Sequence, residues 1–349
     1  MPRWLIYALG GGLGHVTRAL GLAHAASRLG QQVEVLSNSP FLADLLPIAT
    51  RRWPDLRIEP IDADLDRQAV AARVDAHLAG ARFDLLVVDT FPRGLAGELE
   101  SLLPALRLPK VLVHRDLTPA YVAAKDLGSF VASYDLVLLP GEKGPLARGA
   151  EPERIGTDPW LCCDAHELWP RAKARARLGA DGDRPLVLVL GTGSADEARA
   201  MAALAQDLAR ALGSRALVRC CAPPGVTSHA SAACGPPSEE PSAIWHWPAL
   251  ELFAGVDVLI GAAGYNTVAE ARAASIPLLC IVRQRRYDRQ RLRVDGEHVI
   301  ELPNLDPDAV AERVQRLLGA ARSGLPSFPN GARDAAQAIV RLGARHAPG

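Results

Sequence analysis

Residues 256–282 read VDVLIGAAGYNTVAEARAASIPLLCIV and decide the fold. The stretch opens with an apolar run at 256–260 and closes with another at 277–282, and each has the length of a buried strand. A turn of small residues follows the first run and leads into a helical segment that starts at Tyr265. A strand, a helix and a second strand in this order are typical of a parallel α/β sheet.

The same alternation continues outward along the 349 residues of the chain. Helical patterns, clearest at 15–29 and 66–79, separate further apolar runs of strand length. These runs lie at 4–9, 32–36, 57–61, 84–88, 110–114, 135–139, 185–190, 216–220 and 243–247. We therefore predict an α/β protein of two Rossmann-like domains, whose parallel sheets face a cleft that binds a ligand at the carboxyl ends of the strands.

Breaks in this pattern suggest the boundaries. We predict a first Rossmann-like domain at 1–155, a linker at 156–168, a second Rossmann-like domain at 169–325 and a C-terminal segment at 326–349. The last of these holds a helix at about 332–344. Residues rich in Pro, Gly and Ser at 222–242 predict a flexible loop inside the second domain.

Composition narrows the class of protein. The 39 basic and 39 acidic residues give no net charge, which argues against a nucleic-acid-binding protein. None of the six cysteines forms a C-x-x-C pair, so reduced cytosolic thiols are expected. The run at 4–9 is too short for a signal peptide, and no stretch is long enough to span a membrane. We expect a soluble, cytoplasmic protein.

The first apolar run ends in GGGLGH at 10–15, and a helix follows. A glycine turn before a helix can bind an anion, although the spacing departs from the dinucleotide-binding fingerprint and a tight turn also explains the glycines. His15 opens the helix, where the helix dipole disfavours a positive charge and leaves the imidazole able to accept a proton. We predict that His15 is a general base; the alternative is a surface histidine that caps the turn.

Polar residues also follow the next two strands of the first half. Asp89 ends the run at 84–88, and it either orients His15, binds an acceptor hydroxyl or forms a turn. Arg93 lies in the same loop. Arg115 belongs to a His-Arg-Asp triplet at 114–116, without the glycine loop and D-F-G motif of a kinase. We predict that Asp89 is a catalytic residue and that Arg93 and Arg115 bind an acceptor.

The opening stretch carries the clearest candidate site. After the strand come Gly264 and then Tyr265, Asn266 and Thr267, whose backbone N–H groups at the start of a helix suit a diphosphate. Glu270 lies one turn further along the same face, where it either bonds ribose hydroxyls or completes a helix cap. Beyond the second strand, Asp288 and Gln290 suit sugar hydroxyls, and three arginines at 283, 285 and 286 either contact an anion or are solvated.

This segment, 256–290, resembles the donor-binding region of GT-B glycosyltransferases, in particular the MurG-like and UDP-glycosyltransferase-like groups. The shared pattern is Gly, small polar residues and Thr, then Glu, then a proline-led strand and a D-x-Q motif. The resemblance implies that the glycine and Thr face the diphosphate, that Glu binds ribose, and that the Asp and Gln read the sugar. Those roles fall on Gly264, Asn266, Thr267, Glu270, Asp288 and Gln290.

Three other segments extend the resemblance. The stretch GLGHVTRAL at 12–20 is similar to the family's acceptor loop, which places Gly12, Gly14 and Arg18 at the acceptor and makes His15 the base. The loop after the strand at 185–190 resembles the one that touches the diphosphate from the opposite side, with the residues Gly191, Thr192, Gly193 and Ser194. His246 stands where the family covers the nucleobase.

The resemblance implies transfer of a sugar from a nucleotide-diphosphate sugar, most simply a UDP-sugar, to a small-molecule, lipid or glycan acceptor. No cofactor is called for, and because no D-x-D motif ends a strand, we expect a mechanism without metal. Three alternatives stay open: hydrolysis, since some MurG-like enzymes use a G-x-G-H-x-x-R loop to activate water, epimerisation, and a non-catalytic binding subunit. Peripheral contact with a membrane is also open.

Overall fold

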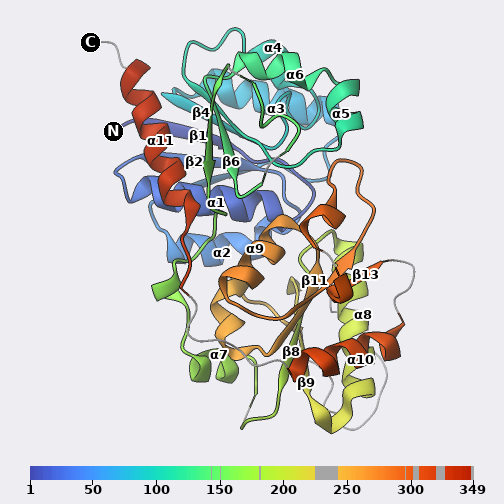
Figure 1. Ribbon diagram of the computed structural model, residues 1–349. Helices are drawn as coiled ribbons and strands as arrows, with labels where there is room; N and C mark the ends of the chain where they lie inside the picture. The colour runs from blue at the N-terminus through green and yellow to red at the C-terminus, as the bar shows by residue number, and fades with distance from the viewer. Residues whose placement is uncertain are drawn as a thin grey trace. The chain divides into compact units, whose positions relative to one another are not determined.

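The computed structural model describes residues 1–142, 144–149, 151–180, 182–224, 243–294, 296–301, 306–319 and 327–346, with only the backbone for residue 297. The chain forms two compact units. The first unit holds Met1–Cys162, Arg286–Asp288 and Pro329–Gly349, and the second holds Cys163–Arg285 and Arg289–Phe328 (Figure 1).

The first unit is built on a sheet of seven parallel strands in the order β3-β2-β1-β4-β5-β6-β7. The inner residues of its central strands are apolar because helices cover both faces of the sheet. The strands are β1 (Arg3–Tyr7), β2 (Gln32–Ser37), β3 (Arg57–Pro60), β4 (Leu85–Asp89), β5 (Lys110–Val113), β6 (Leu136–Pro140) and β7 (Glu153–Thr157).

Two layers of helices enclose this sheet. On one face α1 packs against α11, the C-terminal helix drawn in red in Figure 1. On the other face, residues of α3, α4 and α6 pack against the strands and form a hydrophobic core. Alternate residues of each strand point to this face, and the residues between them point toward α1. The helices are α1 (Leu13–Ser27), α2 (Leu42–Arg52), α3 (Arg67–Gly80), α4 (Leu99–Leu102), α5 (Pro119–Ala124), α6 (Leu127–Phe130) and α11 (Gly331–His346).

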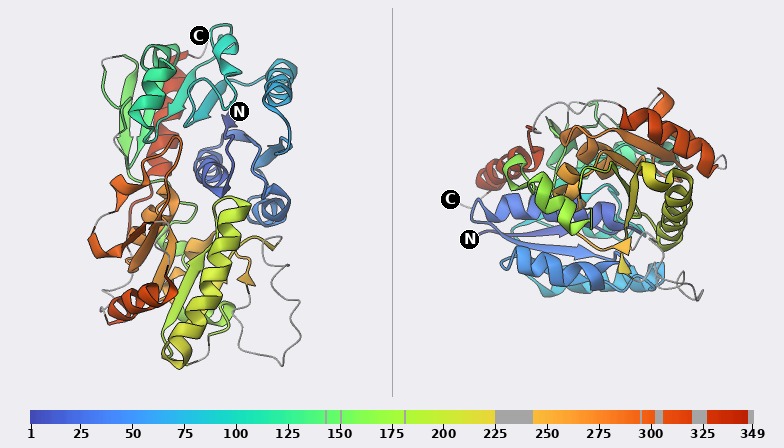
Figure 2. Two further views of the ribbon diagram at one scale, coloured as in Figure 1. Left: turned by 90° about the vertical axis from the view of Figure 1, so that its right-hand side faces the viewer. Right: turned by 90° about the horizontal axis from the view of Figure 1, so that it is seen from below.

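The second unit holds a sheet of six parallel strands in the order β10-β9-β8-β11-β12-β13. Here α8 and α10 lie side by side over one face and bury the main apolar cluster of the unit (Figure 2). The strands are β8 (Leu186–Leu190), β9 (Leu217–Cys221), β10 (Ala243–Ile244), β11 (Val258–Ala262), β12 (Leu278–Val282) and β13 (Val299–Glu301). The helices are α7 (Arg171–Arg177), α8 (Ala195–Leu212), α9 (Tyr265–Ala273) and α10 (Pro307–Leu318).

Each sheet has one point at which the strand order reverses. In the first unit β1 and β4 are neighbours, and in the second unit β8 and β11 are neighbours. Loops that leave such a pair of strands diverge to opposite faces of the sheet and leave a crevice at the carboxyl ends. The predicted His15 follows β1, the predicted Asp89 is the last residue of β4, and the two predicted diphosphate loops follow β8 and β11. The topology therefore brings the predicted residues together within each unit.

The structure corrects several predicted boundaries. The linker expected at 156–168 begins inside β7, an edge strand whose sequence ERIGT lacks an apolar run. The domain expected at 169–325 loses Arg286–Asp288 to the first unit, because Tyr287 packs there. The strand expected at 243–247 contracts to Ala243–Ile244, and β13 was not predicted because it has only three residues. The loop expected at 222–242 lies outside the described residues from 225 onward.

Two further properties bear on the expected class of protein. No helix among the described residues has the length and apolar character needed to cross a membrane. The cysteines at 162, 163, 220, 221 and 280 are free thiols, and all five are buried.

Candidate active site

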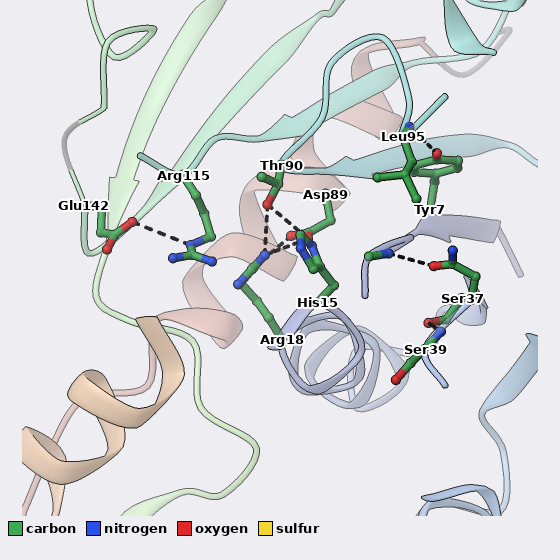
Figure 3. A network of polar contacts seen from close by, with 12 residues as sticks. Tyr7, His15, Arg18, Ser37, Ser39, Asp89, Thr90, Leu95, Arg115 and Glu142 are labelled. Carbon is green, nitrogen blue, oxygen red and sulfur yellow. Dashed lines mark hydrogen bonds and ion pairs between the residues drawn. The ribbon is translucent and has the colours of Figure 1, made fainter. Parts of the chain in front are cut away.

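His15 and Asp89 form a hydrogen-bonded pair in the first unit. Strand β1 ends at Tyr7, a glycine turn follows, and His15 lies in the first turn of α1, while Asp89 is the last residue of β4. His15 Nδ1 lies 2.6 Å from Asp89 Oδ2 (Figure 3). No hydrogen bond to His15 Nε2 is formed by the described residues. A carboxylate on Nδ1 fixes the proton on that nitrogen and leaves Nε2 as the proton acceptor.

Arg18 also binds Asp89. It lies three residues after His15, on the same face of α1, and its side chain is fully buried. Its Nε donates to Asp89 Oδ1 at 2.8 Å and its Nη2 to Oδ2 at 2.6 Å. The sequence prediction placed Arg18 at the acceptor, but a guanidinium that is buried against Asp89 does not reach an acceptor directly.

Asp89 is ionised in this setting. Burial raises the pKa of its carboxyl, but the charge of Arg18 and the hydrogen bond from His15 outweigh burial and hold the pKa well below the usual range. Thr90 adds a third contact, since its hydroxyl donates to Asp89 Oδ2 at 3.1 Å and accepts from Arg18 Nη2 at 3.0 Å. Thr90 has a φ of 70°, a left-handed conformation that is strained for a β-branched residue and that marks this loop as a constrained one.

The imidazole of His15 packs on the glycine turn. A Cβ atom at Gly10 would lie 2.2 Å from His15 Cδ2, so only glycine leaves room for the ring. The Gly10 N–H donates to Asn38 Oδ1 at 2.7 Å, which fixes the turn to the end of β2. On the other side the ring stacks on Phe91, with the centroids 5.6 Å apart. By contrast, a Cβ atom at Gly14 would meet nothing within 4 Å, so the surface beside the ring is open at this predicted acceptor residue.

A buried Tyr–Glu contact, which the sequence analysis missed, fixes the loop that follows Asp89. The hydroxyl of Tyr7 donates to Glu98. The same hydroxyl accepts from the N–H of Leu95 at 2.7 Å (Figure 3). The second oxygen of Glu98 accepts from the Ala96 N–H at 2.8 Å. Burial and the neighbouring Glu98 raise the pKa of Tyr7 well above its usual value, so the phenol stays protonated and keeps donating. The loop that follows Asp89 is therefore fixed to Tyr7, the last residue of β1, through Leu95 and Glu98.

The remaining predicted acceptor residues of the first unit are Gly12, Arg93 and Arg115. Gly12 is the N-cap of α1. Arg93 lies over the ring of Phe130 and pairs with Glu100 at 2.5 Å, and Arg115 lies 3.5 Å from Glu142 (Figure 3). Both arginines lie within the first unit, as expected, and their contact with an acceptor stays a prediction.

In the second unit the start of α9 faces the carboxyl end of β11. Gly264 is the N-cap, and the first helical hydrogen bond runs from the Val268 N–H to the Gly264 carbonyl. The amides of residues 265–267, which include Tyr265 and Asn266, therefore have no intrahelical acceptor. The methyl group of Thr267 packs on Gly261, where a Cβ atom would approach it to 2.8 Å. Such a helix start is suited to a phosphate.

Glu270 lies one turn inside α9 with a buried carboxyl group. It is 8% exposed, and no described residue forms a hydrogen bond with its side chain. Burial raises the pKa of Glu270 to about 8. A buried carboxyl group without a partner is costly to a fold, which is the pattern expected where a ligand hydroxyl supplies the missing hydrogen bond.

The loop after β8 holds the four predicted residues Gly191, Thr192, Gly193 and Ser194. Ser194 caps α8 in a capping box with Glu197, a residue that the sequence analysis missed although the S-x-x-E spacing signals it. Glu197 also forms a two-pronged ion pair with Arg285, with Arg285 Nη2 2.7 Å from Glu197 Oε2. Burial raises the pKa of Glu197, but the hydrogen bonds and charge of Arg285 outweigh it and lower the pKa. Arg285, one of the three arginines that follow β12, is thus held at the start of α8.

The remaining predicted donor residues are Gln290, Asp288 and His246. Gln290 is buried, and its Oε1 accepts from the Arg283 N–H at 3.0 Å. Asp288 belongs to the first unit and Gln290 to the second, although the D-x-Q motif places them two residues apart. His246 Nε2 lies 2.8 Å from Glu251 Oε2, and its ring meets Trp169 edge-on. Across the described residues, no group of three His, Cys, Asp or Glu side chains could hold a metal ion.

Known glycosyltransferases are similar to this chain in sequence and in fold. No family model matches the chain. A UDP-N-acetylglucosamine--N-acetylmuramyl-(pentapeptide) pyrophosphoryl-undecaprenol N-acetylglucosamine transferase from Bifidobacterium adolescentis is 27% identical to it, over 97% of this chain and 96% of the relative.

Solved structures share the fold over nearly the whole chain. The glycotransferase of kitacinnamycin superposes with a TM-score of 0.64 at 17% identity, over 98% of this chain and 99% of the other. The Streptomyces sp. SF2575 glycosyltransferase SsfS6, solved with thymidine diphosphate, gives 0.55 at 15% identity, over 98% and 100%. Together with the two Rossmann-like units, these likenesses show that the chain has the GT-B fold and is similar to the MurG-like and UDP-glycosyltransferase-like groups of glycosyltransferases.

Proposed function

We propose that the protein transfers a sugar from a nucleotide-diphosphate sugar, a UDP-sugar in the simplest case, to a hydroxyl group of an acceptor. The observation that carries this proposal is the contact of 2.6 Å between His15 Nδ1 and Asp89 Oδ2, at the point where the strand order of the first sheet reverses. Sugar transfer to a hydroxyl needs a base, and a neutral histidine held by a carboxylate is suited to that task.

His15 acts as the general base in this proposal. Asp89 holds the proton on Nδ1, so Nε2 takes the proton of the acceptor hydroxyl while the oxygen attacks the anomeric carbon. The imidazolium that forms keeps its hydrogen bond to Asp89 Oδ2. A base that is placed in this way contributes about 10²- to 10⁴-fold in rate.

The donor belongs to the second unit. The start of α9, from Gly264 to Thr267, binds the diphosphate, the loop 191–194 adds contacts from β8, and the carboxyl group of Glu270 bonds ribose hydroxyls. The relative of known activity uses UDP-N-acetylglucosamine, and the structure solved with thymidine diphosphate also points to a nucleoside diphosphate. Gln290 and Asp288 are the sugar-reading candidates, and His246 lies near the nucleobase.

The leaving diphosphate is stabilised without a metal ion. The positive end of the α9 dipole and its amide N–H groups face the charge that develops as the bond to the sugar breaks. Arg283 and Arg285 add positive charge at the neighbouring strand end, and Glu197 neutralises part of it.

The acceptor contacts the first unit. Gly12, the N-cap of α1, and Gly14, where a Cβ atom would meet nothing within 4 Å, are the candidate contacts at the start of α1. Arg93 and Arg115 lie in the loops after β4 and β5. A small molecule, a lipid or a glycan with a free hydroxyl fits this description equally. A lipid acceptor would bring the protein to a membrane surface as a peripheral enzyme.

Hydrolysis is the second candidate, favoured by the spacing of Gly12, Gly14, His15 and Arg18 in a G-x-G-H-x-x-R loop. In that reaction water takes the place of the acceptor at His15. A panel of nucleotide sugars in a thermal-shift screen identifies the donor, because a ligand of the folded state raises its apparent stability. Products are then separated with and without a mixture of candidate acceptors.

Release of the nucleoside diphosphate that depends on an acceptor supports transfer. Free sugar without acceptor contradicts transfer and establishes hydrolysis, and an isomeric nucleotide sugar establishes epimerisation. Binding without any product makes the protein a binding subunit and also contradicts the proposal.

A further inference from the structure

Arg18 has contacts that a merely structural arginine would not need. It is the i+3 neighbour of His15 on α1, its side chain has no exposed surface, and both oxygens of Asp89 accept its hydrogen bonds at 2.6–2.8 Å. The same Asp89 Oδ2 that receives Arg18 Nη2 also contacts His15 Nδ1. The guanidinium and the imidazole therefore share one carboxylate.

The charges of these three groups decide how easily His15 is protonated. His15 touches Asp89 at the end of β4, the uncharged Phe91 ring in the next loop and the backbone of Gly10 after β1. Asp89 in turn touches Arg18 from α1 and the Thr90 hydroxyl. With neutral His15 the group carries no net charge, because the guanidinium balances the carboxylate. A proton on His15 would leave one uncompensated positive charge in a largely buried place.

A lone carboxylate would act in the opposite direction. Without Arg18, Asp89 would keep its negative charge for His15 alone, and a negative charge within hydrogen-bonding distance favours the imidazolium. The His15–Asp89 pair would then take up a proton at higher pH, whichever of the two residues held it. A base that is already protonated near neutral pH accepts no proton from an acceptor.

We propose that Arg18 is a positioning residue that holds Asp89 against His15 Nδ1 and balances the carboxylate charge, so that His15 Nε2 stays unprotonated near neutral pH. This role rests on the proposed function of His15 as the base. It assigns Arg18 an action through Asp89 and no contact with donor or acceptor.

Kinetics of Arg18→Met and Arg18→Lys test the proposal. For Arg18→Met we expect the acid limb of the kcat/KM profile to move upward by about one pH unit or more, since neighbouring charges shift protonation by roughly 1–3 units. The rate then falls most below neutral pH and partly recovers above it, while the donor Kd is unchanged. Arg18→Lys restores the charge without the two-pronged geometry. We expect the acid limb of its kcat/KM profile to lie between those of the wild type and Arg18→Met. Arg51→Met, which removes an exposed arginine from α2, is the matched control.

An unmoved acid limb with a uniformly lower rate would show a structural role and overturn the proposal, as would a loss of donor affinity. Arg18→Met leaves a buried carboxylate without its partner, so a second measurement uses the wild type. Nitrogen NMR of labelled histidine, assigned with His15→Gln, reads the tautomer and protonation of His15 directly. We expect a neutral ring with the proton on Nδ1 at pH 7, and a doubly protonated ring would overturn the proposal. Because NMR needs no turnover, the result stands apart from whether the enzyme transfers or hydrolyses.

Discussion

Asp89 Oδ2 lies 2.6 Å from His15 Nδ1 although 74 residues separate the two in sequence. The contact exists because β1 and β4 are adjacent and parallel, so that the residues that follow one strand and end the other meet at one edge of the sheet. Because two adjacent strands hold the side chains of His15 and Asp89 together, His15 is well positioned to act as a base.

His15→Ala is expected to abolish turnover and to leave donor binding nearly intact. The predicted diphosphate and ribose contacts belong to the second unit, whereas His15 belongs to the first. Loss of a general base costs about 10²- to 10⁴-fold in rate. Steady-state kinetics and calorimetric titration with the donor measure the two quantities separately, and His346→Ala, at an exposed position of α11, is the control. Near-normal turnover, or a donor Kd that rises with the loss of rate, would contradict the role of His15.

Gly10→Ala is expected to lower kcat without a comparable loss of stability. The new Cβ would stand 2.2 Å from His15 Cδ2, so the ring must leave its place on Asp89. Gly11→Ala in the same turn meets nothing within 4 Å and serves as the matched control. In a His15→Ala background the effect of Gly10→Ala on rate should vanish, because the two changes act on one contact. Equal rates for the Gly10 and Gly11 variants would show that the ring position is not needed.

Much of the fold was predictable because buried parallel strands are apolar over most of their length. Runs such as 84–88 and 185–190 became β4 and β8 within one residue at each end. The signal failed at two edge strands: β7 is half exposed and has no apolar run, and β13 has only three residues. The sequence pattern also did not predict that Arg286–Asp288 belong to the first unit. Tyr287 contacts Phe91 and Tyr121, which are far away in sequence.

The candidate site was predictable only where a residue's place in its own element determines its surroundings. His15 and Glu270 each lie in the first two turns of a helix that follows a strand, and that position can be read from local sequence. The burial of Arg18 behind Asp89 could not be read, because the i+3 spacing gives the face of the helix but not what covers it. The Tyr7–Glu98 contact spans 91 residues and carries no local signal at all.

Glu270→Ala is expected to weaken donor binding while the fold persists. Its carboxyl group lies one turn inside α9 and has no hydrogen-bond partner among the described residues. Above pH 8, where the carboxyl group is ionised, loss of its charge-assisted hydrogen bond to ribose should cost roughly 1.5–3 kcal/mol of binding free energy. Calorimetry compares the wild type with this variant and with Glu312→Ala, an exposed glutamate on α10. Equal affinities for all three proteins would remove Glu270 from the donor site.

Turnover is expected to survive EDTA. The N-terminus of α9 and the arginines that follow β12 can stabilise the negative charge of the leaving diphosphate in place of a metal ion. The rate of nucleoside diphosphate release is measured before and after chelation, with Mg²⁺ or Mn²⁺ added back. A loss of rate on chelation that either ion restores would show that a divalent cation is required.

Glu270→Gln is expected to stabilise the unliganded protein increasingly as pH rises. Burial raises the pKa of Glu270 from 4.5 to about 8, so between these values the folded state keeps a proton that the unfolded state has lost. The wild type therefore loses stability as pH rises through this window, and the loss is complete above pH 8. Because a pKa raised by one unit corresponds to about 1.4 kcal/mol, the full loss of stability is roughly 3–5 kcal/mol.

The glutamine variant carries no such proton, so its free energy of unfolding should match that of the wild type near pH 4.5 and exceed it at pH 8. Urea unfolding of the wild type, Glu270→Gln and Glu312→Gln at several pH values measures the difference. A constant difference across pH would show that the carboxyl group of Glu270 titrates normally and is solvated in the folded protein.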